Sequence, residues 1–115
     1  TMVDSIRKKV KVVEDMIQSL KLHNATAQWS RVENMNDKYD FVVSRAVAPF
    51  SDLFEWTGKH VEKHSFNKLK NGLIALKGGD LSTELKNYPD SKIYCLSDYF
   101  DEEYFTEKKI VYMPV

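Results

Sequence analysis

Polar side chains stand where four apolar runs of the sequence end. Asp4, Arg45 and Lys77 each close such a run, and residues 30–33 (Ser-Arg-Val-Glu) follow a further one. In open sheets of parallel strands, ligands bind outside the carboxyl ends of the strands. Arg45 is the first candidate, because a guanidinium among small apolar residues keeps its charge and can hold a ligand. These residues together predict a binding site along one sheet edge.

Each residue also has a plain structural explanation. Arg45 would end its strand and pair with a surface carboxylate, and Asp4 would cap the next helix. Glu33 would be a solvated loop carboxylate, and Lys77 a surface charge beside flexible glycines. The alignment of four such groups on one edge is what favours binding. A carboxylate such as Asp4 offers only acceptors and would accept both hydroxyls of a ribose.

Other reactive residue types lack the spacing that their chemistry needs. His60 and His64 would share a helix face, but no His-Glu-x-x-His pattern or third ligand accompanies them, so no metal site is expected and both are interpreted as solvated helix positions. The sequence contains no G-x-G-x-x-G, Walker or G-x-S-x-G motif. Cys95 has no evident His partner and is interpreted as a small buried hydrophobic residue inside a strand.

Strands and helices alternate along the chain. Apolar residues recur at spacings of three and four from Ile6 to Leu20, which predicts an amphipathic helix that Asp4 or Ser5 would cap and that would end at His23-Asn24. The run Phe41-Val42-Val43 is typical of a strand covered on both faces. The other expected elements are strands near residues 1–4, 25–29, 40–44, 73–76, 92–96 and 109–115, a helix from 49 to about 64, a turn at 71–72 and a short helix or turn over 81–87.

This order predicts an α/β fold with a mostly parallel sheet and an antiparallel element at the end. The 115 residues are enough for one domain and too few for two. Lys+Arg and Asp+Glu balance at 17 each, which neither supports nor excludes a nucleic-acid partner. No apolar run has the length of a membrane span and no signal-peptide pattern is present, so the expected location is the cytoplasm.

Several blocks of the sequence occur in an order typical of one protein family. They are Val3-Asp4-Ser5 with Lys8-Lys9, Ser30-Arg31-Val32-Glu33, Tyr39-Asp40, Ser44-Arg45-Ala46-Val47-Ala48 and Ala75-Leu76-Lys77-Gly78. Together they resemble the bacterial 16S rRNA guanine-N7 methyltransferases, also called glucose-inhibited division protein B. The resemblance implies a Rossmann-like fold that uses S-adenosylmethionine to methylate a guanine N7 of small-subunit ribosomal RNA.

The resemblance also implies roles for single residues. Asp4 falls where the family has its ribose-binding acid, and Val32 and Glu33 fall in the loop at the adenine end of the cofactor. Arg45 corresponds to the arginine that lines the cofactor and substrate pocket, which makes it the catalytic candidate. On the RNA side, Lys77 matches a basic residue, with Arg31 beside the site.

The sequence departs from the family in one respect. The family carries a first strand, a glycine-rich loop and N-terminal helices before the position of Val3, and this sequence starts after them. The first strand would lie between the strands of Val3 and Phe41, so residues 1–115 are expected to form a single partial domain with a gap in its sheet. We expect that this chain alone does not catalyse.

Methylation at guanine N7 needs alignment and a dry pocket rather than a general base, because N7 has a lone pair and no proton. Arg45 would hold the guanine acceptor edge, stack on the base or contact a phosphate. A second hypothesis is a non-catalytic α/β interaction domain whose edge charges bind a protein or nucleic acid. A nicotinamide-dependent oxidoreductase, which would also use an acid like Asp4, ranks third because nothing resembles a hydride-acceptor site.

Overall fold

The computed structural model describes residues 1–45 and 48–115 of the chain. Ala46 and Val47, which belong to the Ser-Arg-Ala-Val-Ala block, lie outside the described residues. The chain forms two compact units, Thr1–Asn36 and Asp37–Val115.

The first unit is a short parallel β-α-β arrangement. It contains β1 (Met2–Asp4), α1 (Arg7–Ser19), β2 (Ala27–Trp29) and the 3-10 turn η1 (Val32–Asn34). β1 pairs with β2 in parallel, with Asp4 opposite Trp29. The helical crossover that parallel strands require is supplied by α1. The predicted order strand, helix, strand is confirmed here.

The ends of α1 differ from those predicted. Its N-cap residue is Ile6, whose N–H donates to Asp4 Oδ1 at 2.8 Å, so Asp4 binds the residue that precedes the helix and does not cap the first turn. The helix stops at Ser19, before the predicted end at His23-Asn24, and Lys21 after it takes a left-handed conformation (φ 52°). Of the apolar side chains along α1, Val10 is the buried one.

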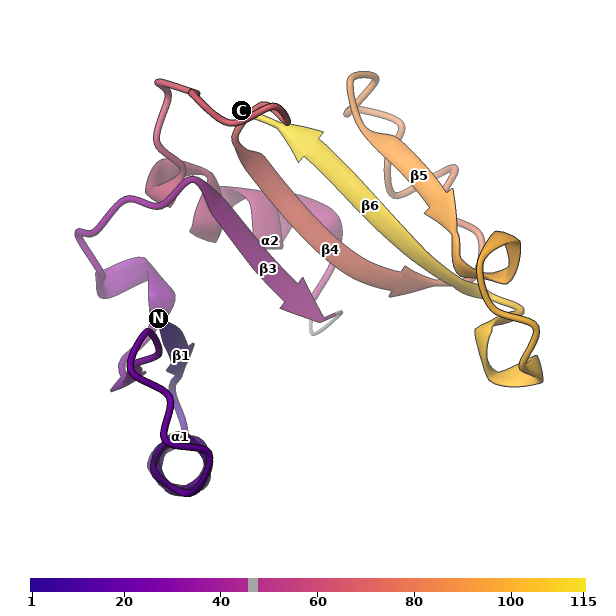
Figure 1. The fold of residues 1–115 in the computed structure, drawn as a ribbon. Coiled ribbons are helices and arrows are strands. Elements are labelled where there is room, and N and C mark those ends of the chain that lie inside the picture. The colour runs from indigo at the N-terminus through magenta and orange to yellow at the C-terminus, as the bar shows by residue number, and fades with distance from the viewer. Residues whose placement is uncertain (46–47) are drawn as a thin grey trace. The chain divides into compact units, whose positions relative to one another are not determined.

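The second unit is built on one four-stranded sheet (Figure 1). Its elements are β3 (Phe41–Arg45), α2 (Phe50–Thr57), η2 (Gly58–His60), β4 (Gly72–Gly78), β5 (Lys92–Cys95), η3 (Leu96–Asp98), η4 (Glu103–Phe105) and β6 (Lys108–Pro114). The strand order is β3-β4-β6-β5. β3 and β4 are parallel, whereas β6 runs antiparallel to both β4 and β5.

The α/β class and the antiparallel terminal strands are therefore confirmed. The sheets are mixed, since the described residues form two parallel and two antiparallel strand pairs. β1 and β3 belong to separate sheets among these residues. A strand between them stays a prediction.

α2 is shorter than the predicted helix. It passes into η2, and Val61 then forms an isolated parallel bridge with Tyr39. His60 and His64 therefore do not share a helix face. The interpretation of His60 as solvated is wrong, because it is 3% exposed and its Nδ1 lies 3.0 Å from the Asp37 carbonyl oxygen.

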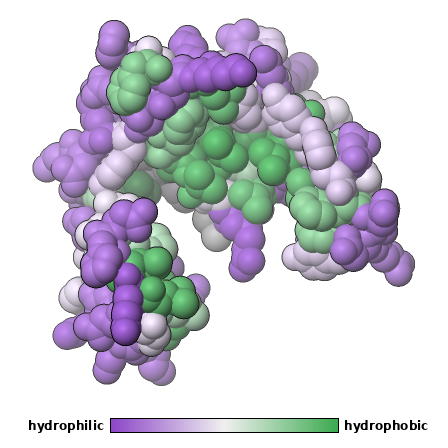
Figure 2. Space-filling view, in the orientation of Figure 1, coloured by the Kyte–Doolittle hydropathy of each residue, from purple (hydrophilic) through white to green (hydrophobic). Residues whose placement is uncertain are grey.

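One face of the four-stranded sheet carries the core. The apolar core residues come from α2, residues 81–85 and three strand positions: Phe50, Leu53, Leu73, Ala75, Leu81, Leu85 and Val111. On the opposite face Val43 is 65% exposed, and Figure 2 shows hydrophobic surface over this sheet. Covering of the strand on both faces is thus not seen among the described residues. Cys95, expected to be buried, is half-buried at the end of β5.

Of the predicted turn at Asn71-Gly72, Asn71 lies in a bend and Gly72 already belongs to β4. Gly72 is the first residue of the strand, and a Cβ there would lie 2.2 Å from the Met113 carbonyl oxygen of β6. Asn71 is fully buried, and its side-chain amide donates to the carbonyls of Glu62 at 2.9 Å and His64 at 3.1 Å. Glycine is present here because two backbones approach closely, and asparagine because it ties down the preceding loop.

Candidate functional site

Arg45 and Lys77 lie at one edge of the second unit's sheet. Because β3 and β4 are parallel and Arg45 is in register with Leu76, the carboxyl ends of the two strands coincide. The sequence predicted this edge from apolar runs that end in cations. Neighbouring residues of a strand point to opposite faces, however, so Arg45 belongs to the face of Val43 and Lys77 to the face of Ala75.

Arg45 is the last residue of β3, and its side chain is exposed. Leu76, opposite it in the register, is half-buried, so the guanidinium stands at the border of an apolar sheet face. A guanidinium in this setting has donors free to meet a phosphate or a carbonyl edge, and its planar group also stacks on aromatic rings. The position is therefore suited to an anionic or nucleobase ligand.

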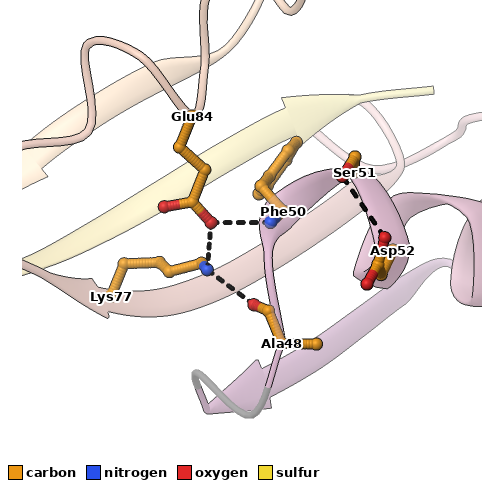
Figure 3. A network of polar contacts seen from close by, with 6 residues as sticks. All are labelled: Ala48, Phe50, Ser51, Asp52, Lys77 and Glu84. Carbon is orange, nitrogen blue, oxygen red and sulfur yellow. Dashed lines mark hydrogen bonds and ion pairs between the residues drawn. The ribbon is translucent and has the colours of Figure 1, made fainter.

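Lys77 points the other way, into the core side of the sheet. Its side chain is 7% exposed, and its ammonium forms an ion pair with Glu84 Oε1 and donates to the Ala48 carbonyl oxygen at 2.7 Å (Figure 3). A buried ammonium requires such acceptors, because desolvation without them is costly. The Lys77 ammonium is thus paired with groups of the protein itself. The contact of Lys77 with RNA stays a prediction.

Glu84 is a functional candidate that belongs to none of the motifs recognised in the sequence. The same oxygen that pairs with Lys77 accepts the N–H of Phe50, the first residue of α2, at 2.6 Å. Glu84 sits in a turn held by buried Leu81 and Leu85, with the Leu85 N–H donating to the Leu81 carbonyl at 2.9 Å. The only signal in the sequence was a carboxylate between two buried leucines in a short helical pattern.

In the first unit, Asp4 occupies the carboxyl end of β1. It is half-buried, and the turn behind it is held by its own bond to Ile6 and by the Trp29 indole N–H, which donates to the Ser5 carbonyl at 3.0 Å. The Asp4 carboxylate is therefore oriented by the backbone and has further acceptor capacity. This suits a group that must accept from two hydroxyls.

The other predicted residues of this unit follow the carboxyl end of β2. Arg31 is exposed, and Val32 and Glu33 are half-buried in η1. Because β1 and β2 are parallel and the Ser30 N–H donates to the Asp4 carbonyl at 3.1 Å, this segment begins directly beside Asp4. The structure thus brings Asp4 and residues 30–33 to one edge within the first unit.

The described residues lack two kinds of structural feature. Within residues 1–45 and 48–115, no three His, Cys, Asp or Glu side chains are grouped so that they could hold a metal ion. Over the same described ranges, none of the helices combines the length and the apolar character that crossing a membrane requires.

Comparison with known proteins gives one family. Residues 1–109 match GidB, described as rRNA small subunit methyltransferase G. The chain is 49% identical over 114 residues to the "Ribosomal RNA small subunit methyltransferase G" of Christiangramia forsetii, and 43% identical to that of Flavobacterium johnsoniae. Each match covers 99% of this chain and 54% of the relative. The chain therefore spans about half the length of the curated relatives it matches.

Proposed function

Because this chain belongs to the GidB family of rRNA small subunit methyltransferase G proteins, we propose that the protein carrying it methylates guanine N7 of 16S ribosomal RNA in the small subunit. The methyl donor in this proposal is S-adenosylmethionine and the location the cytoplasm. The observation that carries the proposal is the match over residues 1–109, within which every predicted site residue falls. Since the chain covers about half of its relatives, the activity is proposed for the whole protein.

The residues of the first unit fit the cofactor's nucleoside. Asp4 presents a half-buried carboxylate at the end of a parallel strand, where a ribose is held in nucleotide-binding α/β folds. Val32 would provide apolar contact at the adenine end, and Glu33 further acceptors there. When bound, S-adenosylmethionine supplies an electrophilic methyl group on a sulfonium.

No proton has to leave the acceptor atom, because N7 of guanine carries an in-plane lone pair and no hydrogen. A side chain with a basic nitrogen or a thiolate is therefore not required at the reacting centre. The protein's part is to bind, orient and exclude water. This agrees with the residue types of the candidates, an aspartate at the end of β1 and an arginine at the end of β3, rather than a histidine or cysteine.

Arg45 is proposed to orient the guanine. Its exposed guanidinium can bind the base through O6, stack on it or hold a neighbouring phosphate, and each of these leaves the N7 lone pair free for methyl transfer. Arg31, exposed beside η1, is proposed to contact the RNA backbone. An RNA contact of Lys77 would require its ammonium to leave Glu84 and the Ala48 carbonyl.

The decisive experiment compares two lengths of the protein. The full-length protein and residues 1–115 are each incubated with unmethylated small ribosomal subunits and S-adenosylmethionine. The modified nucleoside is then identified by mass spectrometry. We expect 7-methylguanosine with the full-length protein and none with residues 1–115, which should also bind S-adenosylhomocysteine more weakly in calorimetry. Methylation at another atom, or no transfer by the full-length protein, would refute the proposal.

A further inference from the structure

Two side chains bind the backbone at the start of α2, one just before Pro49 and one just after it. The Ala48 carbonyl, just before Pro49, accepts from Lys77 Nζ at 2.7 Å, and the Phe50 N–H, just after it, donates to Glu84 Oε1 at 2.6 Å. Lys77 and Glu84 are themselves ion-paired (Figure 3). The positive side chain thus binds the carbonyl oxygen, which has a negative partial charge, and the negative side chain binds the N–H, which has a positive one.

The two side chains are themselves firmly placed. Lys77 extends from β4, which is hydrogen-bonded to β3 on one side and β6 on the other. Glu84 is fixed between Leu81 and Leu85, which are 3% and 8% exposed in the core. Ser51 and Asp52 interact with each other on α2 and do not join the Lys77–Glu84 pair.

The segment that the pair holds begins at the candidate site. Ala48 is three residues after Arg45, and Phe50 begins α2, whose Phe50 and Leu53 enter the core. The bonds of Lys77 and Glu84 therefore hold Ala48 and Phe50, which lie close in sequence to Arg45.

We infer that Glu84, acting with Lys77, is a positioning residue of the proposed methyltransferase site, which sets the position of Ala48 and Phe50 at the start of α2. This inference rests on the proposed function. It assigns Lys77 an indirect role in place of a direct RNA contact. Neither side chain touches the reacting atoms. Their effect reaches the site through the backbone of Ala48 and Phe50.

The test uses full-length variants in the methylation assay on small ribosomal subunits. Glu84→Leu removes both bonds of the carboxylate, whereas Glu84→Gln keeps a carbonyl oxygen that can accept from the Phe50 N–H. We expect Glu84→Leu to lower kcat about 10- to 100-fold, since misplacement of a site element has effects of this size, and KM for the subunit to stay within about twofold. Glu84→Gln should retain most of kcat. Glu55→Leu, an exposed carboxylate of α2, is the matched control.

Lys77→Met separates positioning from RNA contact. Removal of a lysine that contacts a phosphate reduces the slope of log K for RNA binding against log salt concentration by about one. Removal of a lysine that only positions the site leaves this slope unchanged and lowers kcat. When Lys77→Met is combined with Glu84→Leu, kcat should fall little further than in Glu84→Leu alone, because the two residues act as a unit. The control is Lys86→Met, at an exposed lysine of the same turn.

The reversed pair, Lys77→Glu with Glu84→Lys, gives a further distinction. It restores an ion pair but exchanges the donor and the acceptor, so that a carboxylate comes from the position that now donates to the Ala48 carbonyl and an ammonium from the position that now accepts the Phe50 N–H. We therefore expect kcat to stay low. Recovery of kcat in this variant would show that only the charge pair matters and would overturn the inference. A reduced salt slope in Lys77→Met with unchanged kcat in Glu84→Leu would overturn it as well.

Amide hydrogen exchange provides a readout that does not depend on activity. Glu84→Leu should increase the exchange rate of the Phe50 amide, and Glu84→Gln should increase it less. If the wild-type protein transfers no methyl group, the proposed function fails while this measurement still tests the positioning. Unchanged exchange at Phe50 in Glu84→Leu would refute the positioning even in an active enzyme.

Discussion

Arg45 and Lys77 reach the same edge of the four-stranded sheet but belong to its opposite faces. Arg45 ends β3 in register with Leu76, so the neighbouring Lys77 is turned toward α2 while Arg45 lies on the face of exposed Val43. Two cations that the sequence suggested as one binding group are therefore separated by the sheet itself. Arg45 remains available to a ligand, and Lys77 is committed to Glu84 and Ala48.

Replacing Arg45 should impair methylation without unfolding the protein. Arg45→Ala removes an exposed side chain, so the free energy of unfolding should change by about 0.5 kcal/mol or less. Loss of a charge-assisted contact to the substrate should lower kcat/KM roughly 10- to 100-fold. Steady-state methylation kinetics with a parallel denaturant titration measure both effects. Near-wild-type turnover would remove Arg45 from the site.

Replacing Asp4 should weaken cofactor binding. Asp4→Asn keeps an oxygen for the Ile6 N–H, so the turn after β1 should survive, but it removes the charge and one acceptor. We expect the Kd for S-adenosylhomocysteine to rise about 10-fold or more in calorimetry. Asp15→Asn, at an exposed position of α1, is the control. An unchanged Kd would exclude Asp4 from the ribose contact.

A methyl group at Gly72 should be strongly destabilising. In Gly72→Ala the new Cβ would lie 2.2 Å from the Met113 carbonyl oxygen, which forces β4 and β6 apart. The expected loss is about 1–3 kcal/mol of unfolding free energy, as for other overpacked positions. Gly58→Ala serves as the control, because its Cβ would meet the Phe54 ring at an ordinary 3.7 Å. Equal chemical denaturation midpoints for both variants would contradict this packing argument.

Asn71 should matter for stability through its side-chain amide. Asn71→Ala removes the buried side chain whose amide donates to the Glu62 and His64 carbonyls, so these part-buried carbonyls lose their donor. A buried unsatisfied group costs about 1–3 kcal/mol, so the thermal midpoint should fall clearly. Asn87→Ala, at an exposed position of a different turn, should change it much less. A loss as large in Asn87→Ala would show that the effect is not specific to the Asn71 carboxamide.

The Asp80 carboxylate should stabilise the fold in a pH-dependent manner. The hydrogen bonds from the Ser82 backbone, at 2.9 Å, and from its hydroxyl lower the pKa of Asp80 below its usual value of 3.8. Its stabilising effect is therefore complete above the unfolded-state pKa and is lost as the pH falls through the lower folded-state pKa. Asp80→Asn should be less stable than wild type at neutral pH, with the difference vanishing in acid. A difference that stays constant in denaturant titrations over this pH range would contradict the assignment.

Local patterns were sufficient to predict the strands that carry the candidate residues, whereas the convergence of all these residues on one sheet edge stays a prediction. The apolar runs ending at Asp4, Arg45 and Lys77 became strands β1, β3 and β4, because period and β-branching act over a few residues. The long helix predicted up to His64 failed for the same reason: Val61 continues the apolar pattern, but it pairs with Tyr39 as a bridge. A local pattern of residue types does not show whether a residue will pair with a distant segment.

The sequence by itself determined that the apolar runs that lead to Asp4, Arg45 and Lys77 form strands, that Asp4 precedes a helix, and which family these blocks belong to. Only the tertiary structure decided which of the two cations is exposed and which is buried in an ion pair. That decision depends on which sheet face α2 and residues 81–85 cover, and therefore on whether each position falls on that face. Glu84 acquires its role only because folding brings its carboxylate to Lys77 and Phe50, and the charge of a residue says nothing of the partner it will meet.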